Sequence, residues 1–309
     1  MRILSLPLIS LAMTSLASCE SDRAPPLPAG SPSSPAERSP SSSAAQRATH
    51  VTSKDGTRIA FETAGKGPAL IVVSGALSSR ALQTDKSLVA ELGERFTVYT
   101  YDRRGRGEST DTKPYAVARE VEDIEALIAH AGSSAYLFGV SSGAALSMHA
   151  AATLGPTKVT KLALYEPPYG QEPAAYAKQK QRVAELVKTG QPGQAAEFFL
   201  TAIGTPPNAL DGMKRSPQWP QIAKLDFTLA YDFEILGDGQ VPEATARAIA
   251  VPTLVMTGEK TMPFMHSTGD RIAATVPGAQ RKTLAGQSHQ VKGDVVAPVL
   301  TAFFTPASS

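Results

Sequence analysis

Short continuous apolar runs alternate with segments of helical spacing along this chain, from about residue 50 to its end. Runs of this length that end in glycine or proline are typical of strands buried on both faces. The expected strands are residues 70–75, 96–102, 135–140, 161–168, 253–258 and 281–284, and the expected helices are residues 81–95, 117–131, 143–154 and 267–276, followed by a last helix. The alternation predicts an α/β fold with a mostly parallel central sheet and helices on both faces.

Two segments depart from this alternation. Near its start, the turn Asp55-Gly56 separates two short β-prone runs, which predicts a hairpin. Residues 170–247 are rich in helical patterns and contain the aromatic residues Phe198, Phe199, Trp219, Phe227, Tyr231 and Phe233. We interpret this segment as a helical lid inserted over the carboxyl edge of the sheet, with most of its aromatic side chains in the core. The folded domain is predicted over residues 49–305.

The first 48 residues have a different composition. An apolar stretch over residues 3–17 is short for a bilayer-spanning helix, which needs about 20 residues, and fits the core of a signal peptide. It ends in Leu16-Ala17-Ser18-Cys19, which resembles a bacterial lipobox, whose cysteine receives lipid. The alternative is an ordinary secretory signal with an incidental cysteine. We interpret residues 1–18 as a signal peptide, and residues 19–48 as lipidated Cys19 followed by a disordered tether rich in Pro, Ser and Ala.

Charge and cysteine content exclude several classes of function. The chain has 30 Lys and Arg residues against 28 acidic ones, and a formal charge of +2 gives no strong field for a polyanion. The basic fragment at residues 103–107 is shorter than the patches that track nucleic acid, so no nucleic-acid partner is expected. Cys19 is the only cysteine, which rules out an intramolecular disulfide. No histidine pair shows metal-ligand spacing, and we predict no metal.

The strongest local motif is the G-x-S-x-G sequence Gly139-Val140-Ser141-Ser142-Gly143, between an apolar strand and a helical run. A strand-to-helix turn this tight needs glycine two residues either side of the serine, because a Cβ there would collide with the adjacent backbone. The turn exposes the serine hydroxyl at the sheet edge, beside the free amides of the helix N-terminus. Taken alone, the pentapeptide also fits a glycine-rich bend with an idle serine.

Four motifs in order resemble the α/β-hydrolase superfamily, over nearly all of residues 51–304. LIVVSGAL resembles the family's first central strand and oxyanion loop, YDRRGRGES resembles its D-x-R-G-x-G-x-S turn, and GVSSG resembles its nucleophile elbow. Gln287-Ser288-His289 lies where the family has its histidine loop. The resemblance implies a serine hydrolase. The serine at the elbow separates this chain from the dehalogenase and epoxide-hydrolase branches, which use aspartate there.

The resemblance also implies roles for individual residues. Ser141 would be the nucleophile and His289 the general base, in the family's order of serine, acid and histidine. The backbone amides of Ala76 and Ser142 would form the oxyanion hole, with Ser74-Gly75 in place of the family's usual His-Gly.

Other polar residues of these motifs are expected to be structural. Asp102, Arg103 and Ser109 belong to the turn motif and would fix loops through hydrogen bonds. The remaining histidines precede the domain or fall on expected helices, where packing or surface roles are more common: His50, His130, His149 and His266.

The acid of the triad is the least determined position. In most relatives an aspartate stands three residues after the glycine that ends the seventh strand, and counting from Gly258 that position is Thr261. Glu166, directly after the sixth strand, matches a second position from which some relatives supply the carboxylate. We predict Glu166 as the acid, with Glu259 as the nearest alternative and Asp232 in the lid as a more distant one.

The expected reaction is two-step hydrolysis of an ester-like bond in a small acyl substrate, without a cofactor. Two alternatives stay open: a catalytically inactive, lipid-tethered binding protein, suggested by Thr261 and Ser74, and a lyase or perhydrolase on the same scaffold. The lipobox interpretation adds a membrane as partner. It predicts a protein anchored by lipid in the bacterial cell envelope and facing outside the cytoplasm, in the periplasm or at the cell surface.

Overall fold

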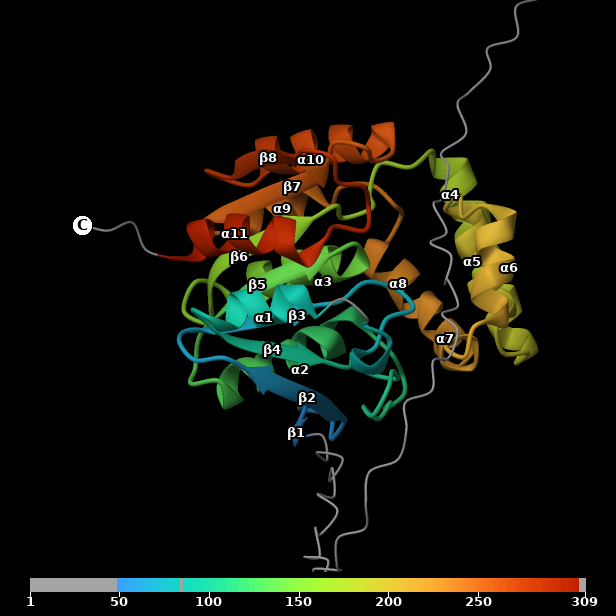
Figure 1. Ribbon diagram of the computed structural model, residues 1–309, viewed down its shortest axis with the longest axis horizontal. Coiled ribbons are helices and arrows are strands. Elements are labelled where there is room, and N and C mark those ends of the chain that lie inside the picture. Colours follow the sequence, from blue (N-terminus) through green and yellow to red (C-terminus); the bar gives the residue numbers. More distant parts are fainter. Residues whose placement is uncertain (1–48, 84–85, 306–309) are drawn as a thin grey trace, which may run out of the picture. The chain divides into compact units, whose positions relative to one another are not determined.

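The predicted sheet is present and has eight strands in the order β1-β2-β4-β3-β5-β6-β7-β8 (Figure 1). This arrangement comes from a computed structural model that describes residues 49–83 and 86–305. The strands are β1 (Thr49–Thr52), β2 (Arg58–Ala64), β3 (Ala69–Val73), β4 (Thr97–Tyr101), β5 (Ala135–Val140), β6 (Val159–Tyr165), β7 (Thr253–Gly258) and β8 (Gln280–Leu284). The signal peptide, Cys19 and tether expected over residues 1–48 lie outside the described residues.

Strand direction divides the sheet into two parts. All neighbouring strands from β4 to β8 in the sheet order pair in parallel, whereas β2 pairs antiparallel with both β1 and β4. The β1–β2 pair is the predicted hairpin, in which Gly56 has a φ of +86° and Thr57 N donates to Asp55 Oδ1 at 3.0 Å. Because the parallel strands run the same way, their carboxyl ends meet along one edge, where such folds bind ligands.

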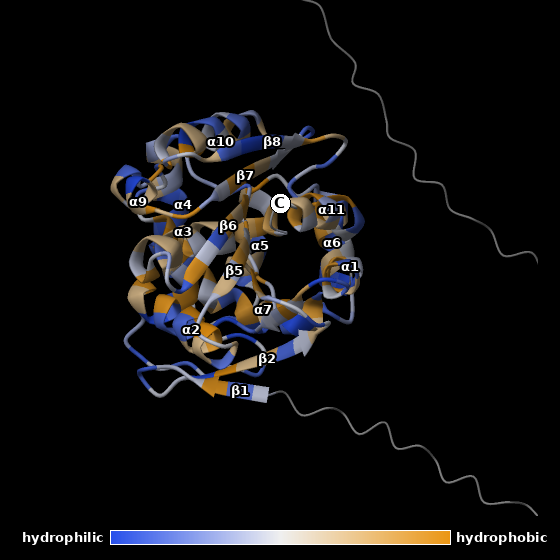
Figure 2. Cartoon of the chain, turned by 90° about the vertical axis from the view of Figure 1, so that its left-hand side faces the viewer, coloured by the Kyte–Doolittle hydropathy of each residue, from blue (hydrophilic) through white to orange (hydrophobic). Residues whose placement is uncertain are grey.

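Alternate residues of each buried strand enter two separate cores. Ile71 and Val73 of β3 pack in one core, and Leu70 and Val72 pack in the other. The first face is covered by α2 (Val117–His130), α3 (Ser142–Leu154), α9 (Glu243–Ala248) and α10 (Pro263–Thr275), and the second by α1 (Ser87–Gly93) and α11 (Gly293–Phe304) (Figure 2). The predicted fold class is therefore confirmed.

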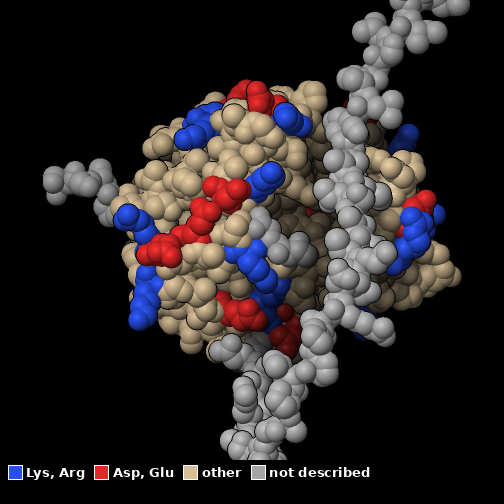
Figure 3. Space-filling view, in the orientation of Figure 1, with Lys and Arg blue, Asp and Glu red and all other residues tan. Residues whose placement is uncertain are grey.

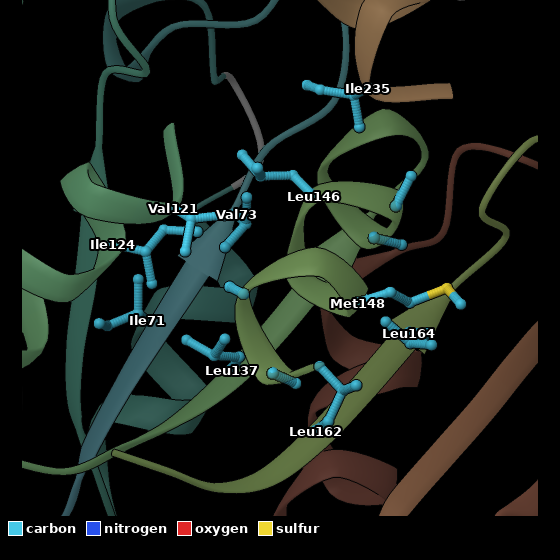
Figure 4. Packing of buried hydrophobic residues seen from close by; sticks show 14 of the residues in the cluster. Ile71, Val73, Val121, Ile124, Leu137, Leu146, Met148, Leu162, Leu164 and Ile235 are labelled. Atoms are coloured by element: carbon cyan, nitrogen blue, oxygen red, sulfur yellow. The ribbon is translucent and has the colours of Figure 1, made fainter. Parts of the chain in front are cut away.

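The segment between β6 and β7, here called the insertion (residues 166–252), is built of helices as predicted. It contains α4 (Pro173–Thr189), α5 (Gln194–Ala202), α6 (Pro207–Arg215), α7 (Trp219–Leu225), the short 3-10 helix η2 (Asp226–Thr228), α8 (Leu229–Leu236) and α9. Phe233 is buried, with ring centroids 5.4 Å from Tyr176 and 6.4 Å from Phe199, so these aromatic residues pack together inside the insertion. Helix α8 also contributes Ile235 to the first core (Figure 4).

Two helices begin several residues away from their predicted starts. Residues 81–95 were expected as one helix, but the structure has a 3-10 helix η1 (Arg80–Leu82), and α1 begins only at Ser87. Helix α10 begins at Pro263, ahead of the expected residue 267, because proline fits the first turn of a helix. Among the described helices, none is long and apolar enough to cross a membrane.

Candidate active site

The expected nucleophile elbow has the tight geometry that its glycines predict. Ser141 lies between β5 and α3 with φ of 55° and ψ of −127°, a backbone conformation that L-residues rarely adopt. A Cβ on Gly139 would lie 2.5 Å from Ala144 Cα, and one on Gly143 would lie 2.6 Å from Ser74 O. Both glycines are therefore required by sterics, as predicted. The elbow places Ser141 at the carboxyl edge of the sheet.

Three side chains form a continuous set of contacts at this edge. His289 Nε2 lies 3.1 Å from Ser141 Oγ, and His289 Nδ1 lies 2.7 Å from Glu166 Oε2. A carboxylate can only accept, so Nδ1 is the donor of that bond, which leaves Nε2 to accept from the serine hydroxyl. The Glu166 side chain is fully buried, and the His289 side chain is 34% exposed. The structure thus brings together the three residues that the sequence singled out.

Glu166 is fixed by its backbone and by two further donors. It directly follows β6, has a φ of 49°, and its N–H donates to Met256 O at 3.0 Å. Gly258 N donates to Glu166 Oε1 at 2.7 Å, and Thr261 Oγ1 donates to Oε2 at 2.9 Å. In the sequence, Thr261 stands out only as the residue that replaces the usual aspartate. Its position three residues after Gly258 was the signal that this side chain points at the same carboxylate–histidine pair.

The other two candidate carboxylates bond elsewhere. Glu259 Oε2 accepts from Gly286 N at 2.7 Å, which fixes the start of the histidine loop. Asp232 accepts from Ser142 Oγ at 2.7 Å and from two arginines. The geometry therefore favours Glu166 over Glu259 and Asp232 as the partner of the histidine.

The histidine loop is held against the ends of β6 and β7. Tyr165 OH donates to Ser288 O, and burial, with the nearby Glu166 charge, raises the pKa of this phenol, so it stays a donor. A Cβ on Gly258 would lie 2.6 Å from the Gln287 carbonyl carbon, so the loop crosses directly over the end of β7. Gln287 Oε1 accepts from Lys292 N at 3.0 Å, which ties the loop to the start of α11.

The expected oxyanion loop lies next to the elbow. A Cβ on Gly75 would lie 3.0 Å from Ser141 Cβ, so the backbone of this loop approaches Ser141 closely. Ser142 is the first residue of α3, where backbone amides have no partner within the helix. Ala76 follows Gly75 and is partly exposed. The positions of Ala76 and Ser142 suit the roles predicted for their amides.

Residues expected to be structural make loop and packing contacts. Asp102 Oδ1 accepts from Arg80 N at 2.7 Å, and Ser109 Oγ donates to Asp102 O at 2.6 Å, which confirms the loop role of both. His149 Nε2 lies 3.1 Å from Ile235 O, and burial lowers the pKa of this imidazole. Within the described ranges, no group of three or more His, Cys, Asp or Glu side chains is arranged to hold a metal ion.

Comparison with curated proteins gives matches over short segments. A proline iminopeptidase, PfmaB, from Pestalotiopsis fici is 29% identical over 75 residues, which is 24% of this chain and 27% of that protein. A probable oxidoreductase, EphD, from Mycobacterium tuberculosis is 39% identical over 83 residues, which is 25% of this chain and 14% of that protein. The match thus covers a minor part of either relative.

Comparison with families and solved structures covers most of the chain. The crystal structure of an alpha/beta hydrolase from Sphaerobacter thermophilus is 42% identical with a TM-score of 0.73, and the match covers 83% of this chain and 100% of that one. A hydrolase from Pseudomonas aeruginosa, 24% identical over 85% of this chain and 100% of its own, is similar in fold with a TM-score of 0.68. The model of the alpha/beta hydrolase family matches residues 70–299. This chain therefore belongs to the alpha/beta hydrolase family.

Proposed function

We propose that this protein is a serine hydrolase that cleaves an ester-like bond of a small acyl substrate through Ser141, His289 and Glu166. The observation that carries the proposal is the continuous series of contacts from Ser141 Oγ to His289 Nε2 at 3.1 Å, and from His289 Nδ1 to Glu166 Oε2 at 2.7 Å. A hydroxyl, an imidazole and a buried carboxylate in this order are the parts that activate a serine nucleophile.

The contacts support a two-step reaction. His289 Nε2 takes the Ser141 proton as Ser141 Oγ attacks the carbonyl carbon, and the amides of Ala76 and Ser142 donate to the carbonyl oxygen as it becomes charged. The imidazolium then gives its proton to the leaving alcohol, and the acyl group stays on Ser141. Water repeats the sequence and releases the acid. Glu166 stabilises the imidazolium in both steps because its carboxylate is fixed by Gly258 N and Thr261 Oγ1.

The ester specificity has chemical support. An amine leaving group needs more complete protonation than an alcohol, so esters are the easier substrates for an activated serine. The formal charge of +2, and the interspersed acidic and basic side chains on the face shown in Figure 3, suit a small substrate better than a polyanion. Hydrolysis of p-nitrophenyl esters should exceed that of a prolyl p-nitroanilide, the amide type suggested by the iminopeptidase relative.

Labelling with a fluorophosphonate tests the nucleophile directly. The wild type should gain one adduct by intact mass, and Ser141→Ala should gain none. Ser147→Ala is the matched control. The Ser147 hydroxyl, on α3, donates to Gly143 O at 2.8 Å and not to His289, so this variant should still be labelled. No adduct on the wild type would support the binding-protein alternative. Equal labelling of wild type and Ser141→Ala would exclude Ser141 as the nucleophile.

We also propose that Cys19 carries lipid and anchors the domain to a membrane of the bacterial cell envelope, outside the cytoplasm. The support is the lipobox-like sequence before Cys19 and the Pro- and Ser-rich segment after it. Expression of the full chain in a bacterial host should place it in the membrane fraction, and Cys19→Ala should release it. Unchanged fractionation of Cys19→Ala would contradict the anchor.

A further inference from the structure

Four charged side chains lie buried beside the elbow. Arg103, Arg106, Glu120 and Asp232 are each at most 3% exposed, and they carry two positive and two negative charges. Arg103 Nε and Nη2 donate to the two Glu120 oxygens, each at 2.7 Å. Asp232 Oδ1 accepts from Arg103 Nη1 at 2.7 Å, and both Asp232 oxygens accept from Arg106 Nη2 at 2.9 Å. We call these four residues the buried ionic cluster.

Arg106 also reaches the loop of the expected oxyanion hole. Its Nη1 donates to Gly75 O at 2.5 Å. That carbonyl belongs to the same peptide group as Ala76 N–H, and in a trans peptide the two bonds point in opposite directions. A guanidinium held on the carbonyl therefore fixes the direction of the amide. By polarising the peptide it also strengthens the amide as a donor.

The Asp232 carboxylate also fixes Ser142, whose backbone amide is the second expected donor of the oxyanion hole. Ser142 Oγ donates to Asp232 Oδ1 at 2.7 Å, and this fixes the first residue of α3, whose amide is the other expected oxyanion donor. Asp232 lies on α8 of the insertion. One side chain of the insertion therefore connects the loop after β3, through Arg106, with the N-terminus of α3.

Stability alone does not account for this arrangement. A buried ion pair can lose more free energy of hydration than its mutual attraction returns. Burial raises the pKa of Asp232, but Arg106 and Arg103 bring it below its ordinary value, so the carboxylate is ionised. Arg106 Nε is buried and has no hydrogen-bond partner among the described residues. The guanidinium thus faces Asp232 and Gly75 while one of its own donors stays unpaired, an unfavourable state for a buried group.

We propose that the buried ionic cluster orients both amide donors of the oxyanion hole, with Arg106 and Asp232 as positioning residues. This inference rests on the proposed function, because it takes the amides of Ala76 and Ser142 as the groups that bind the oxyanion. Such donors act on charge that develops in the transition state. Weakening the cluster therefore lowers kcat and leaves KM nearly unchanged.

Arg104 offers a matched control on the same loop. It is fully buried, and its Nε and Nη2 donate to the two Asp123 oxygens at 2.8 and 2.7 Å, while Nη1 donates to Asp55 at 2.8 Å. These partners lie on α2 and in the β1–β2 turn, away from the oxyanion loop. Arg104→Lys and Arg106→Lys each replace a buried two-pronged donor with a single ammonium, so they disturb the loop in the same way.

The experiment measures steady-state hydrolysis of a p-nitrophenyl ester and inhibition by phenylboronic acid, which forms a tetrahedral adduct with an active serine. Loss of one oxyanion donor costs about 10²- to 10³-fold in kcat, so a displaced donor in Arg106→Lys should cost about 10- to 100-fold. KM should change by less than about threefold, and boronic acid affinity should fall with kcat. Arg104→Lys should keep kcat within about threefold of the wild type.

Milder variants guard against misfolding of Arg106→Lys. Asp232→Asn keeps the shape of the side chain and removes its charge, and Ser142→Ala removes the hydroxyl but keeps the amide. Both should lower kcat and boronic acid affinity together. Arg106→Lys should add little to Asp232→Asn in the double variant, because both act through one contact.

Separate outcomes refute the two proposals. A wild type that neither hydrolyses the ester nor binds the boronic acid contradicts the proposed function, and this inference falls with it. An active wild type whose Arg104→Lys and Arg106→Lys variants lose kcat equally contradicts the positioning role alone. The same conclusion follows if Asp232→Asn and Ser142→Ala keep wild-type kcat.

Discussion

Glu166→Gln removes the negative charge beside His289 Nδ1 and leaves the size of the side chain unchanged. The carboxylate accepts from that nitrogen at 2.7 Å, from Gly258 N at 2.7 Å and from Thr261 Oγ1 at 2.9 Å. A glutamine has only one acceptor oxygen for these donors. Its NH2 group, turned towards the ring, favours the tautomer with the proton on Nε2, which cannot accept the serine proton. The corresponding change in a Ser-His-Asp enzyme costs about 10⁴-fold in kcat, or about 5 kcal/mol of activation free energy.

We therefore expect Glu166→Gln to lower kcat by about 10³- to 10⁴-fold, with a smaller change in KM. Hydrolysis of a p-nitrophenyl ester measures both constants, and thermal unfolding checks that the variant is folded. Glu259→Gln is the matched control, because this exposed carboxylate accepts from Gly286 N at 2.7 Å, and its loss should cost less than about tenfold. Glu166 is not the acid if Glu166→Gln keeps a tenth of the wild-type kcat while Glu259→Gln loses orders of magnitude.

Three other sites carry predictions. Thr261→Ala removes one donor to Glu166 and should lower kcat by about five- to tenfold, whereas Thr261→Ser should keep most of it; equal kinetics of the two would contradict this role. Burial lowers the pKa of His149 from 6.5, so the folded state binds a proton more weakly than the unfolded chain and stability is lost as the pH falls below 6.5. His149→Gln should therefore make the free energy of unfolding in urea less dependent on pH between about 7 and 5, and an unchanged slope would count against it. Gly143→Ala should lower the free energy of unfolding by more than about 3 kcal/mol, since its Cβ would lie 2.6 Å from a carbonyl oxygen. Gly212→Ala, whose Cβ would lie in open space on a helix, should raise it by about 0.5–1 kcal/mol, and thermal unfolding distinguishes the two variants.

The strands could be predicted because burial on both faces leaves little besides apolar residues in them. The predicted runs 135–140 and 253–258 coincide with β5 and β7, since glycine and proline mark where such strands end. Helix starts were less predictable. The start of α1 at Ser87 was missed, because an apolar spacing does not distinguish an α-helix from the 3-10 helix that precedes it.

Some residues of the candidate site could be predicted from the sequence, and others could not. Ser141 could be named because its turn requires glycines at fixed positions. Glu166 could be named because it directly follows a strand, at a position from which some members of the resembled family supply the carboxylate. The contacts of Thr261 and Arg106 depend on side chains that are 95 and 126 positions away along the chain. A sequence pattern indicates which residues share a turn or a helix. It does not indicate which distant carboxylate a buried arginine will meet.

The position of the proposed acid follows from the geometry of two adjacent strands. β6 and β7 are neighbours in the sheet, so a side chain that leaves the end of either strand can approach His289. Glu166 Oε2 lies 2.7 Å from His289 Nδ1 and accepts from Thr261 Oγ1 at 2.9 Å, so both positions converge on one point. A second carboxylate there would repel the first and raise the pKa of one of them, whereas a hydroxyl donates to it. A threonine at the usual acid position therefore suits a carboxylate that is supplied from the end of β6. In the proposed reaction the negative charge must lie beside His289 Nδ1, and the end of either strand can place it there.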